Sequence, residues 1–276
     1  MRIDAHQHFW RLLRGDYGWL TESFGPIYRD FLPEDLRPLI AAEGISRTVL
    51  VQAAPSIAET DFLLDLAERE PLVAGVVGWT DLEAPGAADD IRRLAERPAL
   101  LGLRPMIQDI PDDGWMLRPT LAPALRAMVD GGLAFDALVK PQHLANLRRF
   151  LASYPDLRVV VDHGGKPDIA GGGFPAWAEA MRTIAKESKA VCKLSGLVTE
   201  AAPGWTPEDL RPYVDVLLEA FGPARLMWGS DWPVLNLNGD YRGWLRTAEA
   251  LLAGLSEAEL ELVFGGVAKT FYRLEL

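Results

Sequence analysis

The sequence has few of the features that define secreted or membrane proteins. It contains one cysteine, Cys192, so no internal disulfide can form, and we expect a reducing compartment, the cytoplasm. After Met1 the chain continues without the apolar segment of a secretory signal. No uncharged apolar run approaches the roughly 18 residues of a membrane span. The sequence therefore predicts a cytoplasmic protein without a membrane partner.

Positive charge is also scarce. The 28 lysines and arginines are outnumbered by 39 aspartates and glutamates, which gives a formal net charge of -11. Nucleic-acid binders normally carry a basic patch, and none is visible, so we expect no nucleic-acid partner. The simplest role of the acidity is solubility. If the substrate is an anion, local cations must hold it.

Two catalytic or cofactor motifs are missing. No Gly-x-Ser-x-Gly motif is present, which argues against a serine hydrolase. No Gly-x-Gly-x-x-Gly follows the first predicted strand, which weakens the case for a doubly wound open sheet and an organic cofactor. We see no linker or repeat either, and we expect one domain over residues 1–276.

Short apolar, β-branched runs alternate along the chain with longer amphipathic stretches, as in proteins with parallel sheets. The eight predicted strands are Ile3–His8, Arg47–Ala53, Val73–Thr80, Leu100–Met106, Leu133–Val139, Leu157–Asp162, Ala190–Leu194 and Leu226–Gly229. The predicted helices are Pro33–Glu43, Ser56–Glu70, Ala84–Arg97, Thr120–Asp130, Pro141–Ser153 and Thr206–Phe221, and prolines and glycines mark their ends. Eight strand–helix units predict an α/β protein with a (β/α)8 TIM barrel.

The connections after three predicted strands are long. They are the aromatic-rich stretch 9–32, the stretch that contains Gly171–Gly173, and the stretch from Trp232 to Tyr241. In such barrels these connections lie at the carboxyl ends of the strands, where active sites occur. The pattern therefore points to a ligand site on that face.

The first strand ends in Asp4-Ala5-His6-Gln7-His8. Side chains alternate along a strand, so we expect Asp4, His6 and His8 on one face. Two imidazoles at this spacing can hold one divalent cation. We expect Asp4 to orient the His6 ring by accepting its free N–H.

Two further strands end in polar residues. The run Val159–Val161 is followed by Asp162, His163 and two glycines, which places His163 at the barrel mouth as a ligand or a general acid/base. Asp231 ends the last strand, which closes against the first. Asp231 can therefore meet His6 and His8 as a metal ligand or as the base that deprotonates water.

These motifs together resemble the amidohydrolase superfamily (amidohydrolase-related family 2). Within it, the resemblance is to the branch of sugar-lactone hydrolases that contains L-fuconolactonase-like and L-rhamnonolactonase-like proteins. The matching segments run nearly end to end: Asp4–Trp10, Val51–Ala54, Gly75–Asp81, Gly102–Pro105, Asp162–Pro167, Lys193–Gly196 and Gly229–Pro233. The resemblance implies a distorted (β/α)8 barrel, hydrolysis of a lactone ester, and Asp231 as general base.

One departure from the superfamily pattern concerns metals. Many members place a bridging carboxylated lysine or glutamate on the fourth strand and a histidine on the fifth. Here the fourth strand offers Arg104, and the fifth offers Asp136 and Lys140. We therefore expect one divalent ion, zinc, rather than two, with His6, His8, Asp231 and His163 as its ligands. The alternative is that the histidines polarise the carbonyl directly.

Substrate contacts are expected from four side chains at strand ends, namely Arg104, Gln52, Trp79 and Lys166. Arg104 can pair with a carboxylate or a hydroxyl of the substrate. The sequence leaves open which lactone is used, whether it is charged, and whether the protein forms a homo-oligomer. It also leaves two rival functions: a non-oxidative decarboxylase of the same superfamily, and a catalytically inactive ligand-binding barrel.

Overall fold

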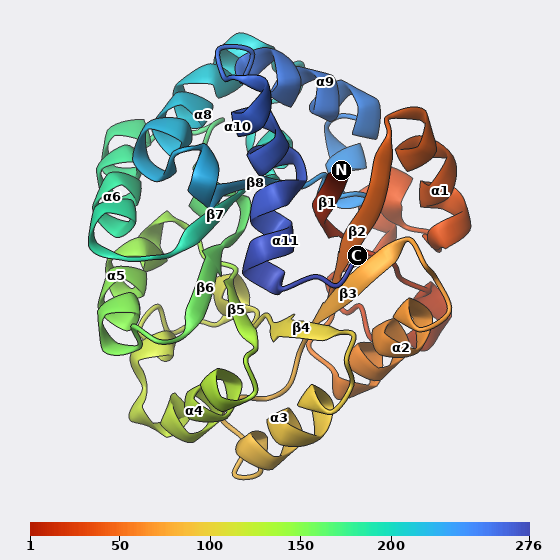
Figure 1. Ribbon diagram of the computed structural model, residues 1–276, viewed down its shortest axis with the longest axis vertical. Helices are drawn as coiled ribbons and strands as arrows, with labels where there is room; N and C mark the ends of the chain where they lie inside the picture. The colour runs from red at the N-terminus through yellow and green to blue at the C-terminus, as the bar shows by residue number, and fades with distance from the viewer.

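The computed structural model describes residues 1–276 and is built around a parallel sheet of eight strands in the order β1 to β8 (Figure 1). The strands are β1 Arg2–Gln7, β2 Ile45–Val51, β3 Val73–Gly78, β4 Leu100–Leu103, β5 Ala134–Ala137, β6 Arg158–Val161, β7 Val191–Leu194 and β8 Leu226–Trp228. A parallel bridge between Gln7 and Trp232 joins β1 to the segment that follows β8. The predicted (β/α)8 barrel is confirmed. Most predicted strands extend one to three residues too far at their carboxyl ends.

Helices surround the barrel (Figure 1). They are α1 Pro33–Ala42, α2 Ile57–Ala67, α3 Ala87–Ala95, α4 Ala122–Asp130, α5 Leu144–Ser153, α6 Phe174–Glu187, α7 Leu197–Glu200, α8 Pro207–Phe221, α9 Tyr241–Leu251, α10 Glu257–Glu261 and α11 Val267–Tyr272. All six predicted helices are present. The predicted helices do not include α6, α7, α9, α10 and α11. A signal for α6 is present in the sequence, because its buried Trp177, Met181 and Ile184 follow helical spacing.

The core has two layers. A cluster of 71 buried residues fills the space around the barrel, whereas a cluster of 14 lies inside it, so most apolar burial comes from helices packed on strands. The inner cluster includes Tyr272 and Leu274 from the C-terminal segment. A Cβ on Gly265 would lie 2.4 Å from the Met1 carbonyl oxygen, so this segment packs directly on the start of β1. The C-terminal segment therefore closes the amino end of the barrel and leaves the carboxyl end for ligands.

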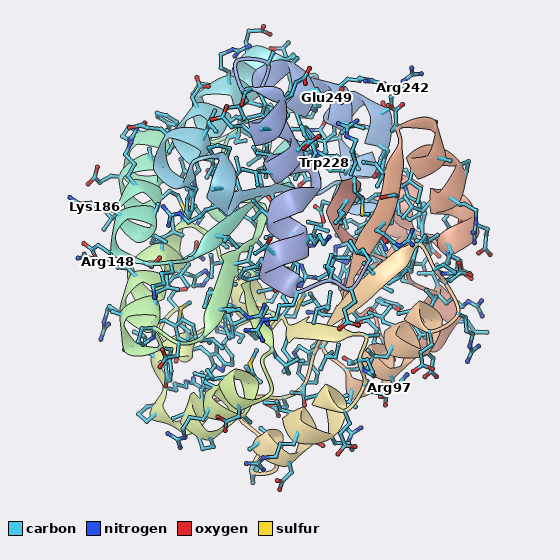
Figure 2. All side chains as sticks on the ribbon, in the orientation of Figure 1. Arg97, Arg148, Lys186, Trp228, Arg242 and Glu249 are labelled. Atoms are coloured by element: carbon cyan, nitrogen blue, oxygen red, sulfur yellow. The ribbon has the colours of Figure 1, made fainter.

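Charged side chains lie mainly at the periphery. Arg148, Lys186 and Arg242 project outward from α5, α6 and α9 (Figure 2). Trp228 of β8 is fully buried. None of the helices combines the length and apolar character that crossing a bilayer would require.

A buried carboxylate holds the chain where it leaves β2. Glu59 of α2 is inaccessible to solvent, and its carboxylate accepts hydrogen bonds from the backbone N–H groups of Ala53 (3.1 Å) and Ala54 (2.8 Å). The Ala53 carbonyl in turn accepts a hydrogen bond of 2.7 Å from the Trp19 indole in the connection after β1. Glu59 thus fixes the segment on which the first long connection rests.

We predict that Glu59→Ala lowers the free energy of unfolding by about 2–4 kcal/mol, because it leaves buried backbone N–H groups without an acceptor. Urea denaturation at pH 7 measures the loss.

Burial raises the pKa of Glu59 from 4.5 to about 7. The folded state therefore binds more protons than the unfolded state between these values, and the contribution of Glu59 to stability falls as pH rises through that window. Urea denaturation from pH 4.5 to 7.5 should show wild type losing stability relative to Glu59→Gln. A constant difference across this range would contradict the prediction.

Candidate active site

A bulge in β1 determines where its two histidines point. Asp4 pairs with Thr48 and Gln7 with Leu50, so three steps along β1 match only two along β2. An extra residue of this kind reverses the inside–outside alternation beyond it. His6 and His8 therefore point into the barrel mouth, where their Nε2 atoms lie 3.2 Å apart, whereas the Gln7 amide bonds Thr48.

The prediction that Asp4 orients the His6 ring is wrong, because the bulge separates their faces. Asp4 points outward, where its carboxylate accepts a hydrogen bond of 3.0 Å from the Tyr241 hydroxyl of α9. It also accepts the backbone N–H groups of His6 (3.1 Å) and Ser230 (2.8 Å). Asp4 therefore positions the backbone of β1 and of the β8 end, and other groups hold the His6 ring.

Closure of the barrel brings Asp231 to the histidines. Its backbone N–H donates to the His6 carbonyl (2.8 Å), and the His8 N–H donates to the Trp232 carbonyl (2.7 Å). A Cβ on Gly229 would lie 2.7 Å from the His6 Cβ, so the close approach of the strands requires glycine there. Asp231 Oδ1 then lies 3.2 Å from His8 Nε2 and 3.8 Å from His6 Nε2.

His163 enters from the end of β6. Its Nε2 lies 3.9 Å from Asp231 Oδ1, and its Nδ1 lies 2.9 Å from the Ser195 hydroxyl. A Cβ on Gly196 would lie 2.5 Å from His163 Nδ1, and Gly196 has φ +64°, so this position requires glycine on both counts. The structure thus brings His6, His8, His163 and Asp231 into one cluster.

Backbone conformation is unusual at the same place. Four residues other than glycine have positive φ, and three of them are His163, Lys166 and Asp231, with φ of 54°, 47° and 59°. Such conformations cost free energy for side chains with a Cβ and gather at functional sites. The strain supports a functional role for these two strand ends.

Beneath the cluster lies a buried network of charges. Lys193 of β7 has no solvent exposure, and its Nζ lies 2.6 Å from Asp136 Oδ2, 3.0 Å from Asp162 Oδ1 and 3.1 Å from His6 Nδ1. The Tyr272 hydroxyl donates to Asp136 Oδ2 at 2.7 Å. No role was predicted for Asp162, although β5 and β7 carry the charged residues Asp136 and Lys193 and a third charged residue, Asp162, directly follows β6.

Arg104 lies at the end of β4 and is almost fully buried. Its guanidinium bonds the Gln52 carbonyl, and its Nη1 lies 3.3 Å from His6 Nε2 and 3.5 Å from Asp162 Oδ2. These contacts hold a positive charge beside the cluster. The carbonyl of Arg104 accepts a hydrogen bond of 2.8 Å from the Gln52 side chain, so the two residues fix each other.

The protonation states follow from burial and neighbouring charge. Burial, and then the charge of Lys193, holds the pKa of His6 well below 6.5, and burial does the same for the pKa of His163. Burial alone would raise the pKa of Asp231, but its interactions with His163 and His8 outweigh this and hold the pKa below 3.8. At neutral pH the cluster therefore presents neutral imidazoles of His6 and His163 beside an ionised carboxylate.

A cavity of about 380 Å³ opens over the cluster at the carboxyl ends of the strands. His8, Arg104, His163, Lys166 and Asp231 line it, together with the aromatic side chains of Trp19 and Phe24. Gln52 and Trp79, which we predicted as substrate contacts, are not among the lining residues. Gln52 has no solvent exposure and lies behind Arg104, and Thr60 hydrogen-bonds the Trp79 backbone.

The fold and the cluster define a (β/α)8-barrel protein with a histidine–aspartate site at the carboxyl ends of its strands. The sequence matches the amidohydrolase family over residues 3–274, and the chain belongs to that family.

Relatives and solved structures agree with this assignment. The chain is 48% identical to an L-fucono-1,5-lactonase of Burkholderia ambifaria over 280 residues, which cover 99% of this chain and 96% of the relative. It is 38% identical to an L-fucono-1,5-lactonase of Burkholderia multivorans, covering 99% and 96%. A crystal structure of an amidohydrolase from Burkholderia multivorans with bound zinc aligns with a TM-score of 0.94 and 38% identity, over 100% of both chains.

We predict that Lys193→Met lowers the free energy of unfolding at pH 7 by about 3–5 kcal/mol, because it leaves two buried carboxylates without their cation. The loss should shrink at pH 5, where protonation of the unpaired Asp136 and Asp162 removes their charge. Urea denaturation at both pH values measures this. Lys189→Met is the matched control, since Lys189 is exposed and should change stability little. Equal losses in the two variants would contradict the prediction.

Proposed function

We propose that this chain hydrolyses the ester ring of a small sugar lactone. The observation that carries the proposal is the position of Asp231, within 3.2–3.9 Å of three histidine nitrogens at the floor of the cavity. The lactonases that share up to 48% of its sequence support the substrate class. The reaction adds one water to the lactone and yields a hydroxy acid, which releases a proton at neutral pH.

Asp231 acts as the general base in this proposal. It lines the cavity, and its pKa below 3.8 keeps it ionised at neutral pH. The carboxylate accepts a proton as the water oxygen attacks the carbonyl carbon. A lactone is an activated ester, so a weak base suffices and no covalent intermediate is needed.

Two other groups act on the charge that develops. The Arg104 guanidinium is held rigidly beside the cluster and stabilises the negative charge on the former carbonyl oxygen. In the metal-free site, His163 Nε2 lies 3.9 Å from Asp231 Oδ1 and is placed to relay the proton to the ring oxygen as the C–O bond breaks. With a metal held on His163, Asp231 itself would return this proton to the ring oxygen.

The cluster also fits one divalent cation. His8 Nδ1 lies 2.8 Å from the Val51 carbonyl and donates to it, so in the neutral ring the Nε2 lone pair faces Asp231 Oδ1 at 3.2 Å. Two acceptors this close need a cation or a proton between them. Atoms held at about 2.1 Å around a tetrahedral zinc ion lie roughly 3.4 Å apart. We propose zinc held by His6, His8, His163 and Asp231; when bound, it would polarise the lactone carbonyl and acidify water.

We predict that Asp231→Asn lowers kcat on an aldonolactone by about 100-fold to 10,000-fold, since the amide cannot accept the proton of water. Proton release in a weakly buffered assay measures the rate. Asp215→Asn on the exposed face of α8 is the control and should keep wild-type kcat. Near-normal kcat in Asp231→Asn would remove Asp231 from this role.

We predict that zinc raises the Tm of wild-type protein, as any ligand of the folded state does, and that equilibrium dialysis gives one ion per chain. The double variant His6→Asn/His163→Asn should lose this shift.

Removal of zinc with a chelator tests the role of the ion in turnover. Turnover that stops and returns with zinc assigns carbonyl polarisation to the ion, and turnover that persists assigns it to the histidines and Arg104.

The rival functions make different predictions. A decarboxylase of this superfamily generally uses a metal-binding histidine on the fifth strand, where this chain has Asp136 bound to Lys193 and Tyr272. Carbon dioxide release from an aromatic acid would support that reading. Tight lactone binding without turnover would support an inactive binding barrel.

We further propose that residues 1–276 act as one domain in the cytoplasm, with a small lactone as partner.

A further inference from the structure

The charges around the cavity do not favour an anionic ligand. The lining contains two cations, Arg104 and Lys166, and three carboxylates, Asp109, Glu200 and Asp231. A negative group on a substrate would therefore have to find a cation that no carboxylate already neutralises.

Arg104 is not available to a distant substituent. Arg104 is 3% exposed. Its guanidinium already contacts the Gln52 carbonyl, the Asp162 carboxylate and His6 Nε2. In the proposed reaction it serves the carbonyl at the cavity floor. A carboxylate elsewhere on the substrate would have to rely on Lys166.

Lys166 is already paired. Its Nζ lies 2.7 Å from Glu200 Oε1, and the two side chains are 18% and 24% exposed within the cavity wall. The geometry of the pair is held from both sides. Lys166 follows the strained turn after β6, and the Glu200 carbonyl accepts the backbone N–H of Ala170 at 3.0 Å, which ties the end of α7 to the connection after β6.

We propose that the Lys166–Glu200 pair determines substrate charge: it admits uncharged polyol lactones and rejects lactones that carry a carboxylate. This inference rests on the proposed lactone hydrolysis and names the substrate class. A carboxylate that approaches Lys166 must displace Glu200 and then lie beside it, and like charges at contact distance repel strongly in a partly buried site. A hydroxyl does not meet this repulsion.

The test compares two lactones of one configuration. One is an aldonolactone, and the other is the aldarolactone, in which the terminal carbon is oxidised to a carboxylate. Wild type should favour the aldonolactone in kcat/KM. Glu200→Gln frees Lys166 without changing the shape of the wall, and the ratio of the two kcat/KM values should fall on the order of tenfold or more.

Two further variants assign the effect to Lys166. Glu200→Gln/Lys166→Met removes both charges and should recover at least part of the lost discrimination. Glu219→Gln makes the same change in net charge on the exposed face of α8, where Glu219 pairs with Arg182, and should keep the wild-type ratio. Thermal unfolding checks that each variant folds.

The outcomes separate the two proposals. If wild type hydrolyses no lactone, the proposed function fails. If wild type hydrolyses both lactones equally, or if Glu200→Gln leaves the ratio unchanged, the role of the pair is overturned while the lactonase stands. If Glu200→Gln does not fold, Lys166→Met alone decides: it leaves Glu200 unneutralised and should increase discrimination against the aldarolactone, and an unchanged ratio would overturn the role.

Discussion

The buried ammonium group of Lys193 is the interaction on which the site depends. It lies between Asp136 and Asp162 and contacts the inner edge of the His6 ring. Burying two carboxylates without a cation would cost several kcal/mol. Asp136 of β5 and Asp162, which follows β6, can therefore lie close together only around Lys193 of β7. The same contact fixes how the His6 ring enters the site. The C-terminal segment takes part through Tyr272, so the last residues of the chain support the centre of the barrel.

Above this network, closure of the barrel turns separate strand ends into one site. Backbone hydrogen bonds between the ends of β1 and β8 set Asp231 against His6 and His8, and the bulge in β1 turns both rings inward. The strained backbone at His163 and Asp231 is held by this frame. A site built on strand ends in this way keeps its charges in place during reaction, which is the condition for electrostatic stabilisation of a developing oxyanion.

The charged groups at the floor of the cavity differ from those in its wall. The floor carries ionised Asp231 beside neutral imidazoles and the guanidinium of Arg104, whereas the wall carries the paired Lys166 and Glu200. The floor therefore provides the means to move a proton and hold an oxyanion, and the wall provides no free cation. This distribution is the basis of the proposed preference for a neutral polyol lactone over one that carries a carboxylate.

The sequence by itself determined the eight strands, six of the helices, the end of the barrel that carries the site, and the residues His6, His8, His163 and Asp231. It could do so because apolar periodicity and polar strand ends are local patterns. Only the tertiary structure decided the direction of Asp4, since a bulge is defined by pairing with β2 and not by β1 alone. It also decided that Lys193 lies beneath His6 and that Lys166 is paired with Glu200. Those contacts join residues from different strands and loops, and their distances depend on how the whole barrel closes.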